Sequence, residues 1–382
     1  MLDAGAAAER LGVKRETLYA YVSRGLVTSR RSADGRSSLF DLAEIERLAS
    51  RSRRERGSAH RLLTLSTATT EVTDEGPRYR GRLATELAGS GSFEEVAALL
   101  WGVPPGSWEP WSLPSLPVAS DRDRIRLAVV LAGASDPSRG DRRPEMVGRA
   151  GSRLIASVAA ALPARDTERP GVGATGIAAV LSRRLGAPTY SPLFERAIES
   201  CLILLADHEL AVSTLAVRVA ASTRASLYDA CLAGLACNGP LHVGASEPAY
   251  GLLVESAARG AAAAVDDALG SGSVLPGFGH FIYTERDPRF EALVAPISAL
   301  SADWGEQLAD LVGVARANGL PAPNVDLAIA ALSLAAGARR DAGVTIFTVA
   351  RLAGWVAHYL EELGEQPLRF RARSLFAPLR DS

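Results

Sequence analysis

The chain has few cysteines, a single lysine and no long apolar run. Cys201, Cys231 and Cys237 are an odd number, lie in apolar helical sequence and lack CxxC spacing, which excludes a dense disulfide framework. No eighteen consecutive apolar residues occur, because Arg, Asp and Glu interrupt the alanine-rich stretches, and the N-terminus lacks the apolar core of a signal peptide. We therefore expect a soluble cytoplasmic protein with reduced, buried thiols and no membrane partner.

The net charge of −1 hides an uneven distribution. Residues 1–60 contain twelve Lys and Arg against eight Asp and Glu, a net charge of +4, which leaves −5 for the remainder. With 382 residues, the chain is long enough for two or three domains and a large buried core. We expect a small basic module joined to a mildly acidic body.

The basic module predicts a winged helix-turn-helix. Apolar spacing favours one helix over residues 3–11 and a second over residues 14–22, separated by a glycine turn. The Asp34-Gly35 pair then predicts a hairpin wing, and a third helix is expected from Asp41. In such modules, side chains at the start of the second helix and on the wing contact DNA. The candidate DNA-binding residues are Lys14, Arg15, Thr17, Tyr19, Arg30, Arg31 and Arg36.

Two stretches, "AAAERLGVKRETLYAYVSRGLV" and "RRSADGRSSLFDLAEIERL", resemble the MerR-type helix-turn-helix family. The resemblance implies a module over residues 1–50 that binds duplex DNA, followed by a basic linker at 51–61 and the body at 62–382. An excess charge of +4 is modest for a DNA-binding module. The alternative is therefore a small helical module that packs on the body or binds protein, with its arginines on a solvated face.

The body predicts an all-α fold. Apolar residues recur at spacings of three and four, and runs that alternate with polar residues are short. A loop is expected over residues 133–145. The predicted helices cover residues 93–101, 124–132, 151–161, 193–205, 216–235, 291–312 and 325–336.

Three of the five histidines lie in short motifs beside a glycine turn or a charged residue. The motifs read "DHE" at 207–209, "GPLH" at 239–242 and "PGFGH" at 276–280, the last followed by "DPR" at 287–289; "PNVD" at 323–326 supplies a carboxylate. Catalytic imidazoles need fixed positions and restricted solvent, so this clustering indicates an active site.

The motifs predict carbonyl chemistry. Backbone donors and a helix end near His242 favour a neutral imidazole, which can donate a hydrogen bond to a carbonyl that becomes an enolate. His280 follows glycines that allow a close approach of backbone and ligand, and it suits a second carbonyl. Asp326 is the candidate base. Its place in the first turn of a helix lowers its pKa, whereas a carbon-acid base needs a raised pKa, so burial would have to outweigh the helix dipole.

Arginines complete the predicted site. Arg289, Arg351 and one of Arg369 or Arg371 are near the histidines in chain order, and guanidinium groups bind carboxylates through two parallel hydrogen bonds. The residues alone therefore indicate a small di- or tricarboxylate ligand.

The body also resembles the citrate synthase family. The matching stretches, in family order, are "YRGRLATELA" from Tyr79, "ADHEL" from Ala206, "NGPLHVGAS" from Asn238, "LPGFGHFIYTERDPR" from Leu275, "PNVDLAIAAL" from Pro323 and "FTVARLAGWVAHYLEE" from Phe347. The resemblance implies a multi-helical body with large and small subdomains, the small one at about residues 220–325. It also implies a homodimer with shared active sites.

The resemblance assigns a role to each residue. Asp326 would remove a methyl proton from acetyl-CoA, His242 would hydrogen-bond the thioester oxygen, and His280 would polarise the ketone of oxaloacetate. Hydrolysis would then release citrate and CoA, with no metal and no cofactor besides the co-substrate. The implied oxaloacetate-binding residues are His208, Arg289, Arg351 and, across the subunit interface, Arg369; the implied CoA-binding residues are Pro276, Gly277, Phe278 and Gly279.

Several flanking residues depart from the family pattern and leave the substrate open. Two basic residues that follow the second histidine in the family are replaced here, which removes expected partners for CoA phosphates. The alternatives are a citrate synthase, a 2-methylcitrate synthase that uses propionyl-CoA, or a transcriptional regulator whose body senses citrate, oxaloacetate or an acyl-CoA. His358 is expected to pack within a helix. The departures are Ala211, Val243, Ser246, Phe281, Thr284 and Phe370.

Overall fold

The computed structural model divides into two compact units, Met1–Ser66 and Thr67–Ser382. The structure describes residues 2–11, 18–19, 21–22, 27–31, 38–40, 45, 65–118, 120–163, 176–186, 191–237, 239, 242–270 and 274–371.

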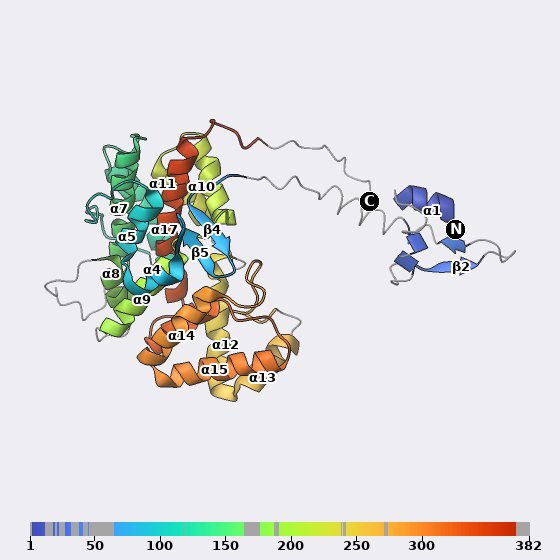
Figure 1. Ribbon diagram of the computed structural model, residues 1–382. Coiled ribbons are helices and arrows are strands. Elements are labelled where there is room, and N and C mark those ends of the chain that lie inside the picture. The colour runs from blue at the N-terminus through green and yellow to red at the C-terminus, as the bar shows by residue number, and fades with distance from the viewer. Residues whose placement is uncertain are drawn as a thin grey trace. The chain divides into compact units, whose positions relative to one another are not determined.

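The first unit contains a short helix and a three-stranded antiparallel sheet. Helix α1 (Ala4–Leu11) begins where the Asp3 side chain accepts a hydrogen bond from the Ala6 amide at 2.9 Å. The sheet has the order β1-β3-β2, formed by strands β1 (Leu2–Asp3), β3 (Ser38–Phe40) and β2 (Ser29–Arg31) (Figure 1). The expected hairpin therefore has both its strands, whereas β1 was not predicted. The buried apolar side chains are Ala7, Ala8, Leu18, Val27, Phe40 and Ile45.

The predicted DNA-binding residues are only partly covered by the described residues. Lys14, Arg15, Thr17 and Arg36 lie outside them. Tyr19 is 47% exposed, and its ring lies 6.4 Å from that of Phe40 in an edge-on contact. Strand β2 contains Arg30, which is exposed, and Arg31. The helix-turn-helix stays a prediction.

The second unit is mostly helical, as the sequence predicted. Its small antiparallel sheet consists of β4 (Thr70–Thr73), β5 (Gly76–Tyr79) and β6 (Arg82–Leu83). The helices are α4 (Ala84–Ser90), α5 (Phe93–Trp101), α6 (Asp121–Ser135), α7 (Pro144–Ala160), α8 (Ile177–Leu185), α9 (Pro192–Leu205), α10 (Val212–Ser222), α11 (Leu227–Ala236), the 3-10 turn η1 (Val243–Ala245), α12 (Ser246–Arg259), α13 (Ala261–Gly270), α14 (Pro288–Leu300), α15 (Ala302–Ala317), α16 (Val325–Ala335) and α17 (Ala342–Leu363).

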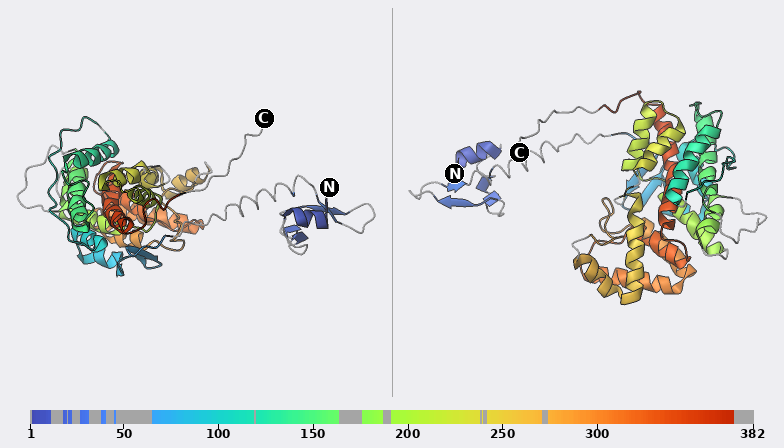
Figure 2. Two further views of the ribbon diagram at one scale, coloured as in Figure 1. Left: turned by 90° about the horizontal axis from the view of Figure 1, so that it is seen from above. Right: turned by 180° about the vertical axis from the view of Figure 1, so that it is seen from behind.

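Helix α17 runs through the middle of the second unit (Figures 1 and 2). Every residue from Ala342 to Tyr359 is buried, and the helix packs against α5, α7, α9 and α10. Such a helix is apolar on all sides, and any charge on it needs a partner inside the protein. Two such side chains on α17, Arg351 and His358, are therefore informative about the site.

Helices α12 to α15 form a second group at one end of the unit (Figure 1). Helix α16 contacts both α12 and α14, so it joins this group to the rest. Helix α11 lies within the expected small-subdomain range of 220–325, but it contacts α10, α6 and α17. In the described part of the chain, no helix combines the length and apolar character that a membrane crossing requires.

Two predicted helices are each broken into two. The expected helix over 216–235 is interrupted between α10 and α11, where Arg224 has φ of 64° and Ser226 caps α11 by accepting from the Asp229 amide. The expected helix over 291–312 is interrupted at Ser301, which caps α15. The apolar spacing continues through both breaks, so it could not reveal them, whereas the serine caps were readable signals.

Candidate active site

The glycine loop before His280 is held against the start of α16. Gly279 N donates to Ala322 O at 2.7 Å, and Asn324 N donates to Gly277 O at 2.9 Å. Gly277 and Gly279 have φ of 81° and 79°, a region that side chains disfavour, and a Cβ on Gly277 would lie 2.8 Å from Leu327 Cβ. The glycines therefore allow the loop to bring His280 to the helix end that carries the candidate base.

Asp287 connects this loop to the same helix end. It caps α14, and its carboxylate accepts from Arg289 Nε at 3.0 Å and Nη2 at 2.8 Å. Its Oδ2 also accepts from the Val325 amide at 3.1 Å, next to Asp326. No role was predicted for Asp287 from the sequence. The structure shows that it fixes Arg289 relative to α16.

His208, His280 and Tyr283 form an aromatic group. The rings of His208 and His280 lie 5.3 Å apart at 81°, and Tyr283 stacks on His280 at 5.0 Å and 26°. His280 Nδ1 accepts hydrogen bonds from the backbone amides of Ile282 and Tyr283, both at 3.1 Å. Because Nδ1 accepts, the proton of the neutral ring is on Nε2. Nε2 can therefore donate a hydrogen bond to a substrate oxygen.

Both imidazoles of this group are neutral at pH 7. Burial, followed by the charge of Arg289, lowers the pKa of His280 from 6.5 to about 4. Burial, then Arg289, Arg351 and His280, lowers the pKa of His208 well below 6.5. His208 Nε2 is buried and has no hydrogen-bond partner within the described residues. The charges of two buried guanidinium groups, those of Arg289 and Arg351, therefore act on His208.

Asp326 has the raised pKa that a carbon-acid base needs. Burial raises its pKa from 3.8 to about 6, against the opposing charge of Arg289. The Asp326 amide donates to the Asn324 side chain at 3.0 Å, which places the residue in the first turn of α16. Loss of water around the carboxylate therefore outweighs the attraction of the Arg289 and Arg351 charges.

His242 and Arg351 lie near each other on different elements. His242 precedes η1, and its ring lies 6.0 Å from that of Phe347 on α17; the Arg351 guanidinium is 4.7 Å from the same ring. Burial and then the charge of Arg351 lower the pKa of His242. His242 Nε2 contacts the Ser213 hydroxyl at 2.9 Å. Burial and the charge of Arg351 therefore account for the neutral imidazole. The helix end that was expected beside His242 is not adjacent to it, because the 3-10 turn η1 separates His242 from α12, which begins at Ser246.

Arg351 is 2% exposed, and its Nε donates to Leu205 O at 3.0 Å.

Arg369 does not lie with the other predicted site residues of the same chain. Its Nε and Nη2 donate to the two carboxylate oxygens of Glu362 at 2.8 and 2.6 Å, in the last turn of α17, whereas Arg351 lies near the middle of that helix. Arg371 is exposed. The cross-subunit role of Arg369 stays a prediction.

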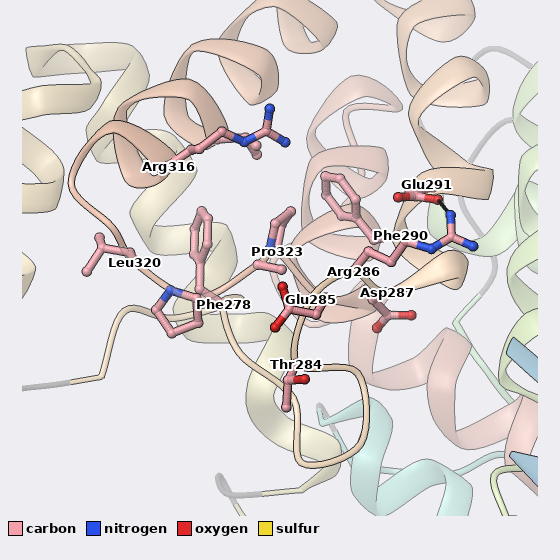
Figure 3. A pocket seen from close by; sticks show the side chains of 13 residues that line it. Phe278, Thr284, Glu285, Arg286, Asp287, Phe290, Glu291, Arg316, Leu320 and Pro323 are labelled. Carbon is pink, nitrogen blue, oxygen red and sulfur yellow. Dashed lines mark hydrogen bonds and ion pairs between the residues drawn. The ribbon is translucent and has the colours of Figure 1, made fainter. Parts of the chain in front are cut away.

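A cavity of about 330 Å³ lies beside the glycine loop (Figure 3). The rings of Phe278 and Phe290 and the guanidinium of Arg316 line it, and Arg286 forms an ion pair with Glu291 at 2.8 Å along its rim. Thr284, one of the departures from the family pattern, also lines this cavity, whereas Phe281 is 98% exposed.

Five residues near the site were given no role from the sequence. Ser213 lies outside the quoted motifs, whereas Tyr283, Phe347 and Asp287 were quoted only as parts of longer matching stretches. A buried aspartate one residue before His208, Asp207, was also given no role, although it is 0% exposed. Among the described residues, no three His, Cys, Asp or Glu side chains are grouped so that they could hold a metal ion.

Comparison with known proteins identifies the family. The citrate synthase C-terminal domain family matches residues 113–373. Citrate synthase 2 of Bacillus subtilis is 28% identical over 335 residues, which cover 79% of this chain and 90% of that protein. The 2-methylcitrate synthase 2 of Corynebacterium glutamicum is also 28% identical, over 339 residues that cover 79% of this chain and 87% of that protein.

Solved structures show the same fold. Citrate synthase of Thermotoga maritima has a TM-score of 0.67 at 23% identity, and the match covers 84% of this chain and 95% of that chain. Citrate synthase of Thermoplasma acidophilum, in a ternary complex with carboxymethyl coenzyme A and oxaloacetate, has a TM-score of 0.62 at 23% identity, and covers 85% of this chain and 97% of that chain. Since the family match spans more than half of the sequence, the chain belongs to the citrate synthase family.

Proposed function

We propose that the chain condenses an acyl-CoA with oxaloacetate and hydrolyses the resulting thioester, which yields citrate and CoA when the acyl group is acetyl. One observation carries the proposal. A neutral His280 that presents its Nε2 proton lies beside the buried Arg289, whose charge also acts on Asp326, a carboxylate whose pKa is raised to about 6. This set can form a carbanion equivalent and polarise the ketone that it attacks.

Each residue has a defined part in the proposed reaction. Asp326 takes a proton from the carbon next to the thioester, and its raised pKa lets it do so while it is still ionised at pH 7. His242 donates a hydrogen bond to the thioester oxygen as the enol forms. If the Ser213 hydroxyl donates to His242 Nε2, the remaining ring proton is on Nδ1 and is free for this bond.

Oxaloacetate is held by imidazole and guanidinium groups in this proposal. Within the described residues Arg351 donates through Nε alone, to Leu205 O, so its two Nη groups are the proposed partners of a substrate carboxylate. Arg289 is oriented by Asp287, and His280 Nε2 donates to the ketone that the enol attacks. No metal is required, because these groups supply the positive partners, and the CoA co-substrate is the only further molecule used.

The cavity beside the glycine loop is the proposed site of CoA. Phe278 connects it to the loop at 276–279, whose backbone would contact CoA, and Arg316 or Arg286 would replace the phosphate partners missing at Phe281 and Thr284 (Figure 3). The acyl preference is open, since relatives named citrate synthase and 2-methylcitrate synthase are equally similar.

The test measures release of free CoA thiol from acetyl-CoA or propionyl-CoA with oxaloacetate. The wild type should release thiol with at least one of the two, and the ratio of the two kcat/KM values defines the preference. Asp326→Ala is the control. Thiol release no faster than in that variant would leave the proposal without support and favour the regulator alternative.

We also propose that the chain forms a homodimer, and that Arg369 of each subunit completes the site of the other. Exposed apolar side chains on two helices that both pack against α11 support it: Leu127 and Val130 on α6 are 36% and 47% exposed, and Val212 and Val219 on α10 are 67% and 41% exposed. Sedimentation of a species of twice 40.1 kDa is expected. A monomer at the concentrations used for the activity assay would contradict it.

A DNA-binding role is proposed for the first unit. The antiparallel β2–β3 pair, with exposed Arg30 opposite Leu39, would serve as the wing, and Tyr19 is exposed on the preceding helical segment. Binding to the DNA upstream of its own gene should weaken as salt rises, and Arg15→Ala with Arg31→Ala should weaken it further. Equal binding by the double variant would exclude this contact.

A further inference from the structure

Three residues of α17 contact three successive residues that end at the position before His208. Arg351 Nε donates to Leu205 O at 3.0 Å, Gly354 N donates to Ala206 O at 3.0 Å, and His358 Nε2 donates to Asp207 Oδ2 at 3.1 Å. Spacings of three and four place these positions of α17 on one face of the helix. The chain entering His208 is therefore held by one stripe of α17.

The contact at Gly354 is backbone against backbone. A Cβ at this position would lie 2.5 Å from Ala206 O and would also overlap the Asp207 carboxylate. The absence of a side chain lets α17 approach closely enough for His358, one helical turn further on, to reach Asp207.

Asp207 and His358 are both 0% exposed, and a buried carboxylate requires a partner. Although burial alone would lower it, the charge of Asp207 raises the pKa of His358 to about 9. Although burial alone would raise it, His358 lowers the pKa of Asp207. His358 Nδ1 faces Glu361 Oε2 at 3.6 Å and Arg218 Nη1 at 3.4 Å.

Arg218 and the two glutamates around His358 are also paired with one another. Arg218 is 0% exposed and binds Glu362 at 2.8 Å through Nε and Glu361 at 2.5 Å through Nη1. Glu361 also accepts from the Ala68 amide at 2.6 Å. The ion pair of His358 with Asp207 is thus the part of this network that is directly joined to the active-site chain.

We propose that His358 is a positioning residue: its ion pair with Asp207 fixes the backbone from which His208 projects, and so sets the affinity for oxaloacetate without contact with it. The choice of oxaloacetate as the ligand rests on the proposed function. The role of His358 goes beyond that function, because His358 is not among the groups proposed to touch substrate.

The first test separates positioning from general stability. His358→Gln keeps an amide donor that can reach Asp207, whereas His358→Leu leaves the carboxylate unpaired. We expect the leucine variant to raise the KM for oxaloacetate about tenfold with a smaller change in kcat, and the glutamine variant to remain within about threefold of wild type. Tyr359→Phe is the matched control, because it removes a bond from α17 to Ala225 O and leaves Asp207 paired.

A second measurement tests the positioning role of His358 without enzyme turnover, and it does not require the His358→Leu variant to fold. The dissociation constant of oxaloacetate, measured by calorimetry, should rise about threefold in wild type as the pH passes about 9, where His358 loses its charge and keeps only a neutral donor like that of glutamine, and should stay flat in His358→Gln. Coincident profiles would overturn the proposal.

A third readout does not need oxaloacetate at all. In protein labelled at histidine Cε1, the His208 resonance should shift above pH 9 in wild type and not in His358→Gln. An identical His208 resonance in both proteins over this range would overturn the proposal. If wild type neither releases thiol nor binds oxaloacetate, the proposed function fails, and this measurement still judges the role of His358.

Discussion

Replacing Asp326 by asparagine should stabilise the protein while it abolishes activity. Asparagine keeps the shape of the side chain and removes its charge. The folded pKa is about 6 against an ordinary value of 3.8, so the folded state binds the proton more tightly than the unfolded chain. Stability from this group is therefore full below about pH 4 and is lost as the pH rises to about 6.

The magnitude follows from the size of this shift. Each pKa unit corresponds to about 1.4 kcal/mol, so the ionised carboxylate destabilises the folded protein by about 3 kcal/mol at pH 7. Asp326→Asn should recover about this amount. With an unfolding entropy of about 2 cal/mol/K per residue, the second unit should gain roughly 5 °C in Tm. Thiol release should fall by about three orders of magnitude, the usual contribution of a general base.

The assay compares urea and thermal midpoints at pH 7 and pH 4. Asp303→Asn is the matched control, because Asp303 is exposed at the same position of the first turn in α15. That change should destabilise by roughly 0.3–1 kcal/mol, since an exposed charge at a helix start is favourable. An Asp326→Asn protein that is no more stable than wild type at pH 7, or equally stabilised at pH 4, would refute the reasoning.

Three further outcomes are expected. Raising the pH from 6.5 to above 9 should lower the free energy of unfolding by about 3 kcal/mol through His358, whose folded pKa exceeds its ordinary value of 6.5; urea midpoints that fall equally in His358→Gln would contradict this. Gly277→Ala should destabilise by about 2–4 kcal/mol, because φ of 81° and contact with Leu327 both oppose a Cβ, whereas Gly81→Ala, at φ of 84° in open space, should cost only about 1 kcal/mol; equal thermal shifts would refute the packing argument. Ser213→Ala should lower kcat for thiol release about tenfold with little effect on the KM for oxaloacetate, and a reversed pattern would exclude a role through His242.

The sequence predicted the helices whose ends carry clear caps. The expected 93–101 matches α5, which has a complete capping box of Ser92 and Glu95. The expected 193–205 matches α9 within one residue, where Ser191 and Pro192 start the helix. Apolar spacing alone could not show the breaks before α11 and α15, because both halves of each pair bury one face.

The residue types of the site could be predicted from the sequence more fully than its chemistry. The order of histidines and arginines along the chain indicates carbonyl and carboxylate chemistry, but the sign of the pKa shift at Asp326 depends on burial, which only the fold determines. His358 was expected to pack within a helix, as it does in α17. Its partner Asp207 is 151 positions away in the sequence, so no local sequence pattern could predict this ion pair.

The backbone contact at Gly354 divides the site into two sets of groups. Arg351 and His208 belong to the block in which α17 is joined to residues 205–207, and their spacing cannot change without breaking that contact. His280 and Arg289 belong to the loop held by α16 and Asp287. The two sets meet where the ring of His208 packs against those of His280 and Tyr283. A ligand that contacts both sets must therefore match a spacing that side-chain packing sets between two separately held stretches of backbone.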